Sequence, residues 1–145
     1  MKGNDFVTFF LNSPLHILMG NTMLITVTGR KTGRKYTTPV GYYQNGDELW
    51  VVTSRDRTWW RNLCAGAQVD LHLHGRNFTA FAEPILDEKA VASQIGNYLQ
   101  HVPMAARPLG IRIGNDGPNA EDAARFARER LFVKVCLKPR GSNNP

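Results

Sequence analysis

Residues 23–43 read "MLITVTGRKTGRKYTTPVGYY", and this stretch decides the fold. A first run rich in apolar and β-branched residues ends at Gly29, and a second run starts at Lys35. Such runs bounded by glycine are typical of β-strands. The turn between them is crowded with basic residues, because Arg30, Lys31 and Arg34 precede Lys35. We therefore predict two strands joined by a strongly basic turn, which we call the basic turn.

Further hairpin signals follow along the chain. Asn45-Gly46, the strongest short hairpin signal, precedes the strand "LWVVTS". Apolar and polar residues alternate over 69–74, and "RNFTAFAEPI" follows Gly75 as the partner strand. "LFVKVCL" supplies a sixth strand. Strands and helices do not alternate as in βαβ units, so we predict an α+β fold, a six-stranded antiparallel barrel-like sheet with peripheral helices.

Helical signals lie outside these strands. Ser13-Pro14 and Gly20 are typical of a helix start and end, "TWWRNL" predicts a short helix, and Asn119 is a candidate N-cap. The predicted segments are an N-terminal helical segment at about 5–20, a short helix at 58–63, helices at 87–102 and 119–130, a long loop of the lid type at 103–118, and a frayed tail at about 139–145. The length of 145 residues favours one domain spanning 1–145.

The composition favours an anionic partner and a reducing compartment. The 18 Lys and Arg outnumber the 12 Asp and Glu, which gives a formal net charge of +6. Cys64 and Cys136 lie far apart with no CxxC spacing, so we expect free thiols, a cytoplasmic protein and no zinc site. The apolar run at 6–19 is interrupted by Asn12, Ser13 and Pro14, so no transmembrane segment is predicted. No nucleic-acid recognition motif is present, and we expect no nucleic-acid partner.

Two basic clusters are the strongest candidates for a binding site. The basic turn lacks the GxxxxGK[ST] spacing of a P-loop and joins two strands. Arg55, Arg57 and Arg61 form a second cluster around "TWWRNL", whose helix N-terminus would add attraction for an anion. Two interpretations stay open: a solvated hairpin tip, or a clamp for one elongated polyanion. His72 and His74 share a strand face with Asp70, which we interpret as a polar outer face without metal.

The stretch "LITVTGRKTGRKYTTPVGYYQNGDELWVVTS", followed by "WWRNL", resembles the deazaflavin-dependent nitroreductase and F420H2-dependent quinone reductase family. The resemblance runs from about residue 23 to 85, with a weaker echo in "LFVKVCLKP". It implies an FMN-binding split-barrel-like fold, coenzyme F420 as cofactor, and often a homodimer. Relatives of this barrel also bind flavin mononucleotide, haem or lipids, so an FMN oxidoreductase and a non-catalytic carrier of a lipid or tetrapyrrole remain alternatives.

The resemblance also implies a set of cofactor-binding residues. By this resemblance, Arg30, Lys31 and Thr32 are expected to lie along the phosphate and oligoglutamate tail of F420. Tyr36 stands where many relatives have arginine, and Arg34 and Lys35 are candidate substitutes. The residues expected near the phosphate or ring are Ser54, Arg55, Trp60 and Asn62.

The implied reaction is hydride transfer from reduced F420 to a small-molecule acceptor that is quinone-like, nitroaromatic or otherwise activated and unsaturated. No catalytic side chain is assigned, and Tyr42, Tyr43 or a water remain candidate proton donors. The aromatic residues that some relatives bring to the acceptor pocket are missing. The 103–118 segment offers Met104, Arg107 and Ile111 instead.

Overall fold

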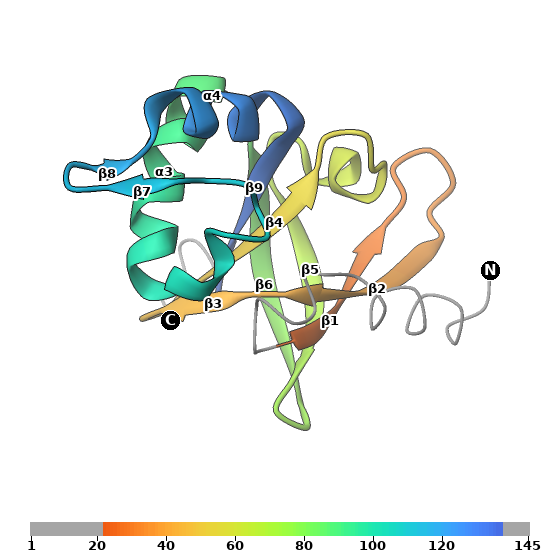
Figure 1. Ribbon diagram of the computed structural model, residues 1–145. Coiled ribbons are helices and arrows are strands. Elements are labelled where there is room, and N and C mark those ends of the chain that lie inside the picture. The colour runs from red at the N-terminus through yellow and green to blue at the C-terminus, as the bar shows by residue number, and fades with distance from the viewer. Residues whose placement is uncertain (1–21, 138–145) are drawn as a thin grey trace.

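The computed structural model describes residues 22–137, which form an antiparallel sheet curled into a half-barrel with two α-helices on one side (Figure 1). The predicted helical segment at 5–20 and the tail at 139–145 lie outside the described residues, and these predictions stay open together with that of one domain. The sheet contains β1 (Thr22–Thr28), β2 (Lys35–Gly41), β3 (Tyr43–Asn45), β4 (Glu48–Ser54), β5 (Ala67–Leu73), β6 (Arg76–Ile85) and β9 (Arg130–Cys136).

The strand order is β2-β1-β5-β6-β9-β4-β3, and every neighbouring pair is antiparallel. The predicted antiparallel sheet is confirmed, but it has seven strands and not six. The error lies in residues 35–43, which we predicted as one strand. The chain leaves β2 at one edge of the sheet and enters β3 at the other edge, with only Tyr42 between them. The sheet must therefore curl until its edges meet at Tyr42, whose side chain is buried.

The core follows the predicted alternation of apolar residues. Met23, Ile25 and Val27 are buried along β1, and β5 buries its apolar positions in the same way. Phe132 of β9 packs against both α-helices, and its ring centroid lies 5.5 Å from that of Tyr98 and 5.9 Å from that of Phe126. Aromatic pairs at this separation add to the energy of burial.

Both α-helices are where the sequence predicts them. α3 (Glu88–His101) begins after Asp87, whose carboxylate accepts from the Ala90 backbone N–H at 2.9 Å. It buries an apolar stripe that includes Ile95 and Leu99. α4 (Ala120–Glu129) begins after Asn119, the predicted N-cap. Among residues 22–137, no helix has both the length and the apolar character that a membrane span requires.

The 103–118 segment contains structure that the sequence did not predict. It holds a 3-10 helix, η2 (Pro103–Ala105), and a two-stranded ribbon of β7 (Ile113–Gly114) and β8 (Gly117–Pro118). Gly117 has φ +107°, which suits glycine at this turn. The prediction of a long irregular loop is therefore wrong.

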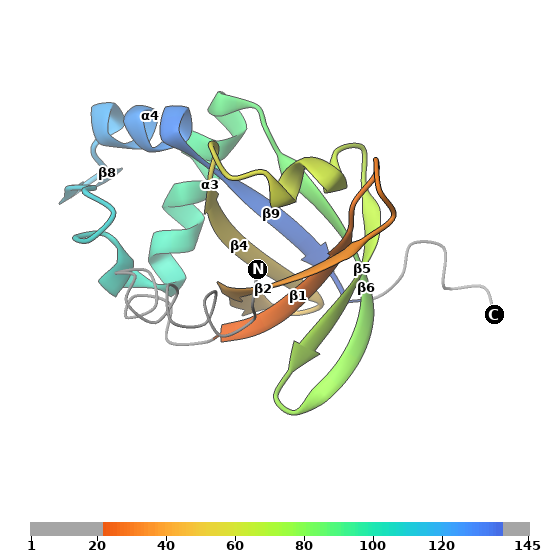
Figure 2. The same ribbon diagram turned by 90° about the vertical axis from the view of Figure 1, so that its right-hand side faces the viewer.

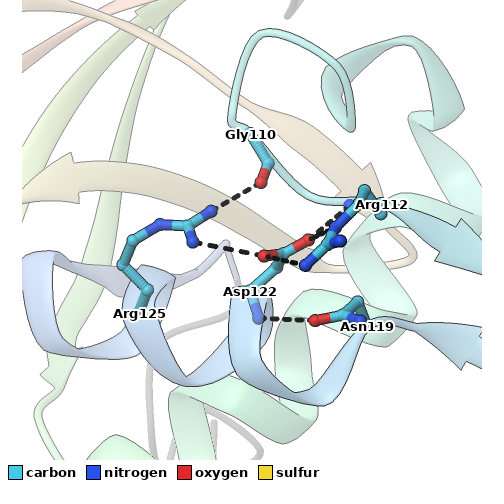
Figure 3. A network of polar contacts seen from close by, with 5 residues as sticks. All are labelled: Gly110, Arg112, Asn119, Asp122 and Arg125. Carbon is cyan, nitrogen blue, oxygen red and sulfur yellow. Dashed lines mark hydrogen bonds and ion pairs between the residues drawn. The ribbon is translucent and has the colours of Figure 1, made fainter.

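A buried carboxylate fastens this segment to α4 (Figure 3). Asp122 is 3% exposed and accepts from the Arg112 backbone N–H and Nε, both at 2.9 Å, and from Arg125 Nη1 at 3.2 Å. Arg125 Nη2 also donates to the Gly110 carbonyl at 2.6 Å. The hydrogen bond from the Arg112 side chain is the main cause that holds the pKa of the Asp122 carboxyl well below its usual range. Asp122 therefore stays charged and ties residues 110–112 to the helix.

Candidate cofactor site

The basic turn lies against a short 3-10 helix, η1 (Trp59–Leu63), and the two are neighbours in both views (Figures 1 and 2). The Gly29 backbone N–H donates to the Arg34 carbonyl at 2.7 Å and thereby closes the turn. Gly33 has φ +74°, a conformation that favours glycine. The basic turn is thus a closed loop with defined internal hydrogen bonds.

Asn62 joins the turn to η1. Its Oδ1 accepts from the Arg30 backbone N–H at 3.1 Å, and its Nδ2 donates to the Trp59 carbonyl at 3.2 Å. The Arg30 guanidinium also donates to the Cys64 carbonyl. The two basic clusters of the sequence are therefore held in one unit before any ligand binds, which lowers the entropy cost of binding.

A cavity of about 600 Å³ opens between the turn, the middle of β2 and residues 57–62. Its volume lies in the range of small-molecule sites. The lining residues are Gly29, Arg30, Lys31, Thr32, Tyr36, Thr37, Thr38, Arg57, Thr58, Trp59, Arg61 and Asn62. Four of them are cationic and none is acidic. The cavity therefore attracts anions, and salt will screen that attraction.

Two aromatic side chains add flat surfaces to this cavity. Tyr36 is 44% exposed, and a Cβ at Gly29 would lie 2.8 Å from its Cε2 atom. Glycine at position 29 thus lets the Tyr36 ring lie close to the turn. Trp59 is half-buried, and its Nε1 donates to Thr53 Oγ1 at 3.3 Å. The cavity combines cationic groups with planar apolar surface.

Four of the eight predicted cofactor residues line the cavity, namely Arg30, Lys31, Thr32 and Asn62. Thr32 has a local role as well, because its Oγ1 accepts from the Arg34 backbone N–H at 3.1 Å. Arg34 is exposed on the same turn but is not among the lining residues. The part of these five residues in cofactor binding stays a prediction.

The other three predicted residues make contacts elsewhere. Ser54 donates to Asp56 at 2.7 Å. Arg55 donates from Nε to the carbonyl of residue 127 at 2.8 Å and from Nη2 to that of residue 86 at 2.9 Å, so it links α4 to the end of β6. Trp60 is 6% exposed and its Nε1 donates to the Ser54 carbonyl at 3.1 Å. The structure thus places Trp59, and not Trp60, on the cavity.

Residues 57–62 bring the side chains of Arg57 and Arg61 to the cavity. η1 has five residues in a 3-10 conformation, and Thr58 at its N-cap makes no side-chain cap hydrogen bond. The predicted short helix is thus a 3-10 helix, and its N-terminus as an anion site stays a prediction. The Arg61 guanidinium lies over the Trp60 ring, 4.8 Å from its centroid, and this contact orients it.

The candidate proton donors and histidines lie away from this cavity. Tyr42 and Tyr43 are buried, and burial raises the pKa of both hydroxyls. The Tyr42 hydroxyl lies 3.2 Å from His74 Nε2, and His72 Nδ1 lies 2.8 Å from Asn77 Oδ1. In the described part of the chain, no group of three His, Cys, Asp or Glu is arranged to hold a metal ion.

A second hollow of about 670 Å³ lies beside η2. It is lined by Met104, Arg107 and Ile111, the residues that the sequence offered in place of the missing aromatic side chains, together with Arg112. Met104 is 70% exposed. The four residues are thus brought together, on the side of the molecule that carries α3.

A half-barrel of antiparallel strands is the split-barrel fold, which solved structures of other proteins share with this chain. The chain is similar to the flavocytochrome Anf3 from Azotobacter vinelandii, at 15% identity and a TM-score of 0.50 over 85% of this chain. It spans 62% of the length of that protein. The sequence model of the F420H(2)-dependent quinone reductase family matches residues 13–105, more than half of the chain. The chain belongs to this family, whose members are oxidoreductases with F420 as cofactor.

Two more solved structures share the fold. One is an F420-H2 dependent reductase (FDR-A), 16% identical with a TM-score of 0.52, which covers 80% of this chain and 93% of that chain. The other is a domain-swapped dimer, also 16% identical with a TM-score of 0.52, and the similarity covers 92% of this chain and 99% of that chain. No curated protein sequence matches the chain. The family predicted from the sequence is confirmed.

Proposed function

We propose that this chain is a reductase that transfers a hydride from reduced F420 to a quinone-like, nitroaromatic or other activated unsaturated acceptor. One observation carries the proposal: four cationic side chains and no acidic one line the cavity beside the basic turn. Membership of an F420H(2)-dependent family gives the class of reaction.

The donor set of the cavity suits F420. Its phosphate and oligoglutamate tail carry several negative charges, whereas flavin mononucleotide carries one phosphate and would neutralise fewer of the four cations. Arg30, Arg57 and Arg61 offer planar guanidinium groups that match phosphate and carboxylate, and Lys31 adds a compact charge. When bound, the deazaflavin supplies the hydride chemistry.

The side chains of this chain contribute binding and orientation. Arg30 and Lys31 hold the anionic part of the cofactor on the turn, and Arg61 holds it from η1. Asn62 keeps the turn and η1 at a fixed separation, so the charges are preorganised. Tyr36 and Trp59 give apolar surface that excludes water along one wall.

Two further properties belong to this proposal. A homodimer is consistent with the similar structure that is a domain-swapped dimer, and light scattering on the purified protein tests it. We also propose a cytoplasmic location, with which the two free, half-buried cysteines, Cys64 and Cys136, are consistent.

The test is a titration of the apo-protein with F420 and, separately, with flavin mononucleotide. We expect Lys31→Ala and Arg61→Ala each to weaken F420 binding about tenfold, the usual loss for a charged hydrogen bond. Lys89→Ala, which removes an exposed charge on α3, is the matched control. The affinity of the wild type should also fall as salt rises.

The reduced, bound cofactor is then mixed with quinone and nitroaromatic acceptors, and its oxidation is followed by absorbance. Tight binding of flavin mononucleotide without F420 binding would favour the FMN enzyme. Binding of neither, with a lipid or haem that co-purifies, would favour the carrier.

A further inference from the structure

β2 is an edge strand of the described sheet, with β1 on one side and no described strand on the other. Each strand residue turns its backbone N–H and C=O to the same side, and successive residues alternate. Half of the residues of β2 therefore turn their backbone groups away from β1. An edge of this kind can pair with an extended ligand.

The register identifies these residues. The Gly29 backbone N–H donates to the Arg34 carbonyl, which continues the β1–β2 ladder by one hydrogen-bonded pair beyond Lys35. Since hydrogen-bonded and non-hydrogen-bonded pairs alternate, the backbone groups of Lys35, Thr37 and Pro39 point away from β1. Pro39 fits this assignment, because proline in an edge strand stands where no N–H is needed by the ladder.

The cavity lies along this edge. Tyr36, Thr37 and Thr38 all line it, although successive side chains of a strand point to opposite faces. A cavity that contacts three consecutive residues therefore runs along the side of the strand and not over one face. The Thr37 Oγ1 lies 2.8 Å from Thr26 Oγ1, so the hydroxyl is already engaged within the sheet. The register turns the Thr37 backbone N–H and C=O toward this edge, and Thr37 is one of the residues that line the cavity.

We propose that the edge of β2 binds the oligoglutamate tail of F420 as an added strand, with the Thr37 backbone N–H and C=O pairing with the two amides that flank one glutamate of the tail. The inference rests on the proposed function and identifies β2 as the element that recognises the tail. Arg30 and Lys31 on the turn and Arg57 and Arg61 across the cavity take the tail carboxylates.

The spacing of the amides limits this pairing to one position of the strand edge. Outward-facing backbone groups recur every second residue of a strand, about 6.8 Å apart. The glutamates of the tail are joined through their side-chain carboxyl groups, which puts five backbone bonds between successive amides, or about 6 Å when extended. Because five is an odd number of bonds, successive amides of an extended tail point to opposite sides, so the tail can face the edge at Thr37 but not at Lys35 and Thr37 together. Pro39 has no N–H, so it cannot pair in this way.

This recognition separates F420 from flavin mononucleotide by chemistry as well as charge. A phosphate can pair with the cations of the cavity, but it has no amide for the strand edge. An unpaired buried N–H or C=O lowers affinity, so the edge favours the ligand that satisfies it.

The first test removes one N–H from the edge. Thr37→Pro deletes the outward N–H and leaves the hydrogen bonds between β1 and β2 intact, while Thr37→Val is the matched variant that lacks the hydroxyl but keeps the N–H. We expect Thr37→Pro to bind F420 about fivefold more weakly than Thr37→Val, the usual loss for one hydrogen bond. The two variants should bind the tail-less deazaflavin equally. Circular dichroism checks that both are folded.

The second test uses the wild-type protein and needs no variant. Calorimetry compares γ-linked triglutamate with its N-methylated analogue, which has the same charge but no amide N–H. Weaker binding of the analogue supports the pairing. Equal binding of the two peptides, or equal F420 affinity of the two variants, overturns the inference while the proposed function stands if Lys31→Ala still weakens F420 binding. Loss of F420 binding by the wild type itself overturns both.

Discussion

Gly66 joins η1 to β5 and allows a direct test of how η1 is held. It has φ +88°, and a Cβ placed on it would lie 2.3 Å from the Cζ atom of Phe81. Gly66→Ala therefore adds two costs. The left-handed conformation costs about 1–2 kcal/mol with a side chain present, and displacement of the Phe81 ring costs about 1–3 kcal/mol. We expect the free energy of unfolding to fall by about 2–5 kcal/mol in total.

Gly75 provides the matched control. It has φ +75°, but nothing lies within 4 Å of a Cβ built on it, so Gly75→Ala carries only the first cost, about 1–2 kcal/mol. Urea unfolding followed by tryptophan fluorescence gives both free energies, and their difference isolates the contact with Phe81. Phe81→Leu in the Gly66→Ala background should recover part of that difference. Equal losses in the two glycine variants would refute the packing of Phe81 on Gly66.

Two further predictions concern polar contacts that join α4 to other parts of the fold. Asp122→Asn should lower the free energy of unfolding at neutral pH. Folding lowers the pKa of this carboxyl, so the charged group stabilises the fold above the ordinary pKa of 3.8, and this stabilisation is lost as the pH falls below that value. In urea unfolding between neutral pH and about pH 3, the difference in unfolding free energy between wild type and Asp122→Asn should therefore become smaller as the pH falls. Arg55→Lys should cost about 1–3 kcal/mol in urea unfolding, because an ammonium cannot reproduce the two directed guanidinium hydrogen bonds to backbone carbonyls.

Features that depend on neighbouring residues could be predicted from the sequence. The hairpins follow from Asn45-Gly46 and Gly75, and the start of α4 follows from Asn119, whose side chain caps the helix. Each of these signals acts within a few residues, so local chemistry is sufficient. The basic turn was located for the same reason.

Features that depend on distant partners could not be predicted. The apolar and β-branched pattern of 35–43 shows no interruption at Tyr42, and only the pairing of β2 and β3 with different strands divides it. Trp59 and Trp60 are identical in type, and tertiary packing decides which one is buried. Asp122 has the position of an ordinary first-turn acid, and its pairing with Arg112 depends on how the 103–118 segment folds back.

The position of β9 has a consequence for the synthesis of the protein. β9 pairs with β4 on one side and β6 on the other, so it fills the middle of the sheet although it follows every other strand of the described chain. Until residue 136 has emerged from the ribosome, the strands formed so far belong to two separate groups, β2-β1-β5-β6 and β4-β3, and β4 and β6 each lack a partner on one side. Such open edges pair readily with other chains. The sheet is therefore completed after translation of β9, and a chain interrupted before residue 130 would be prone to aggregate.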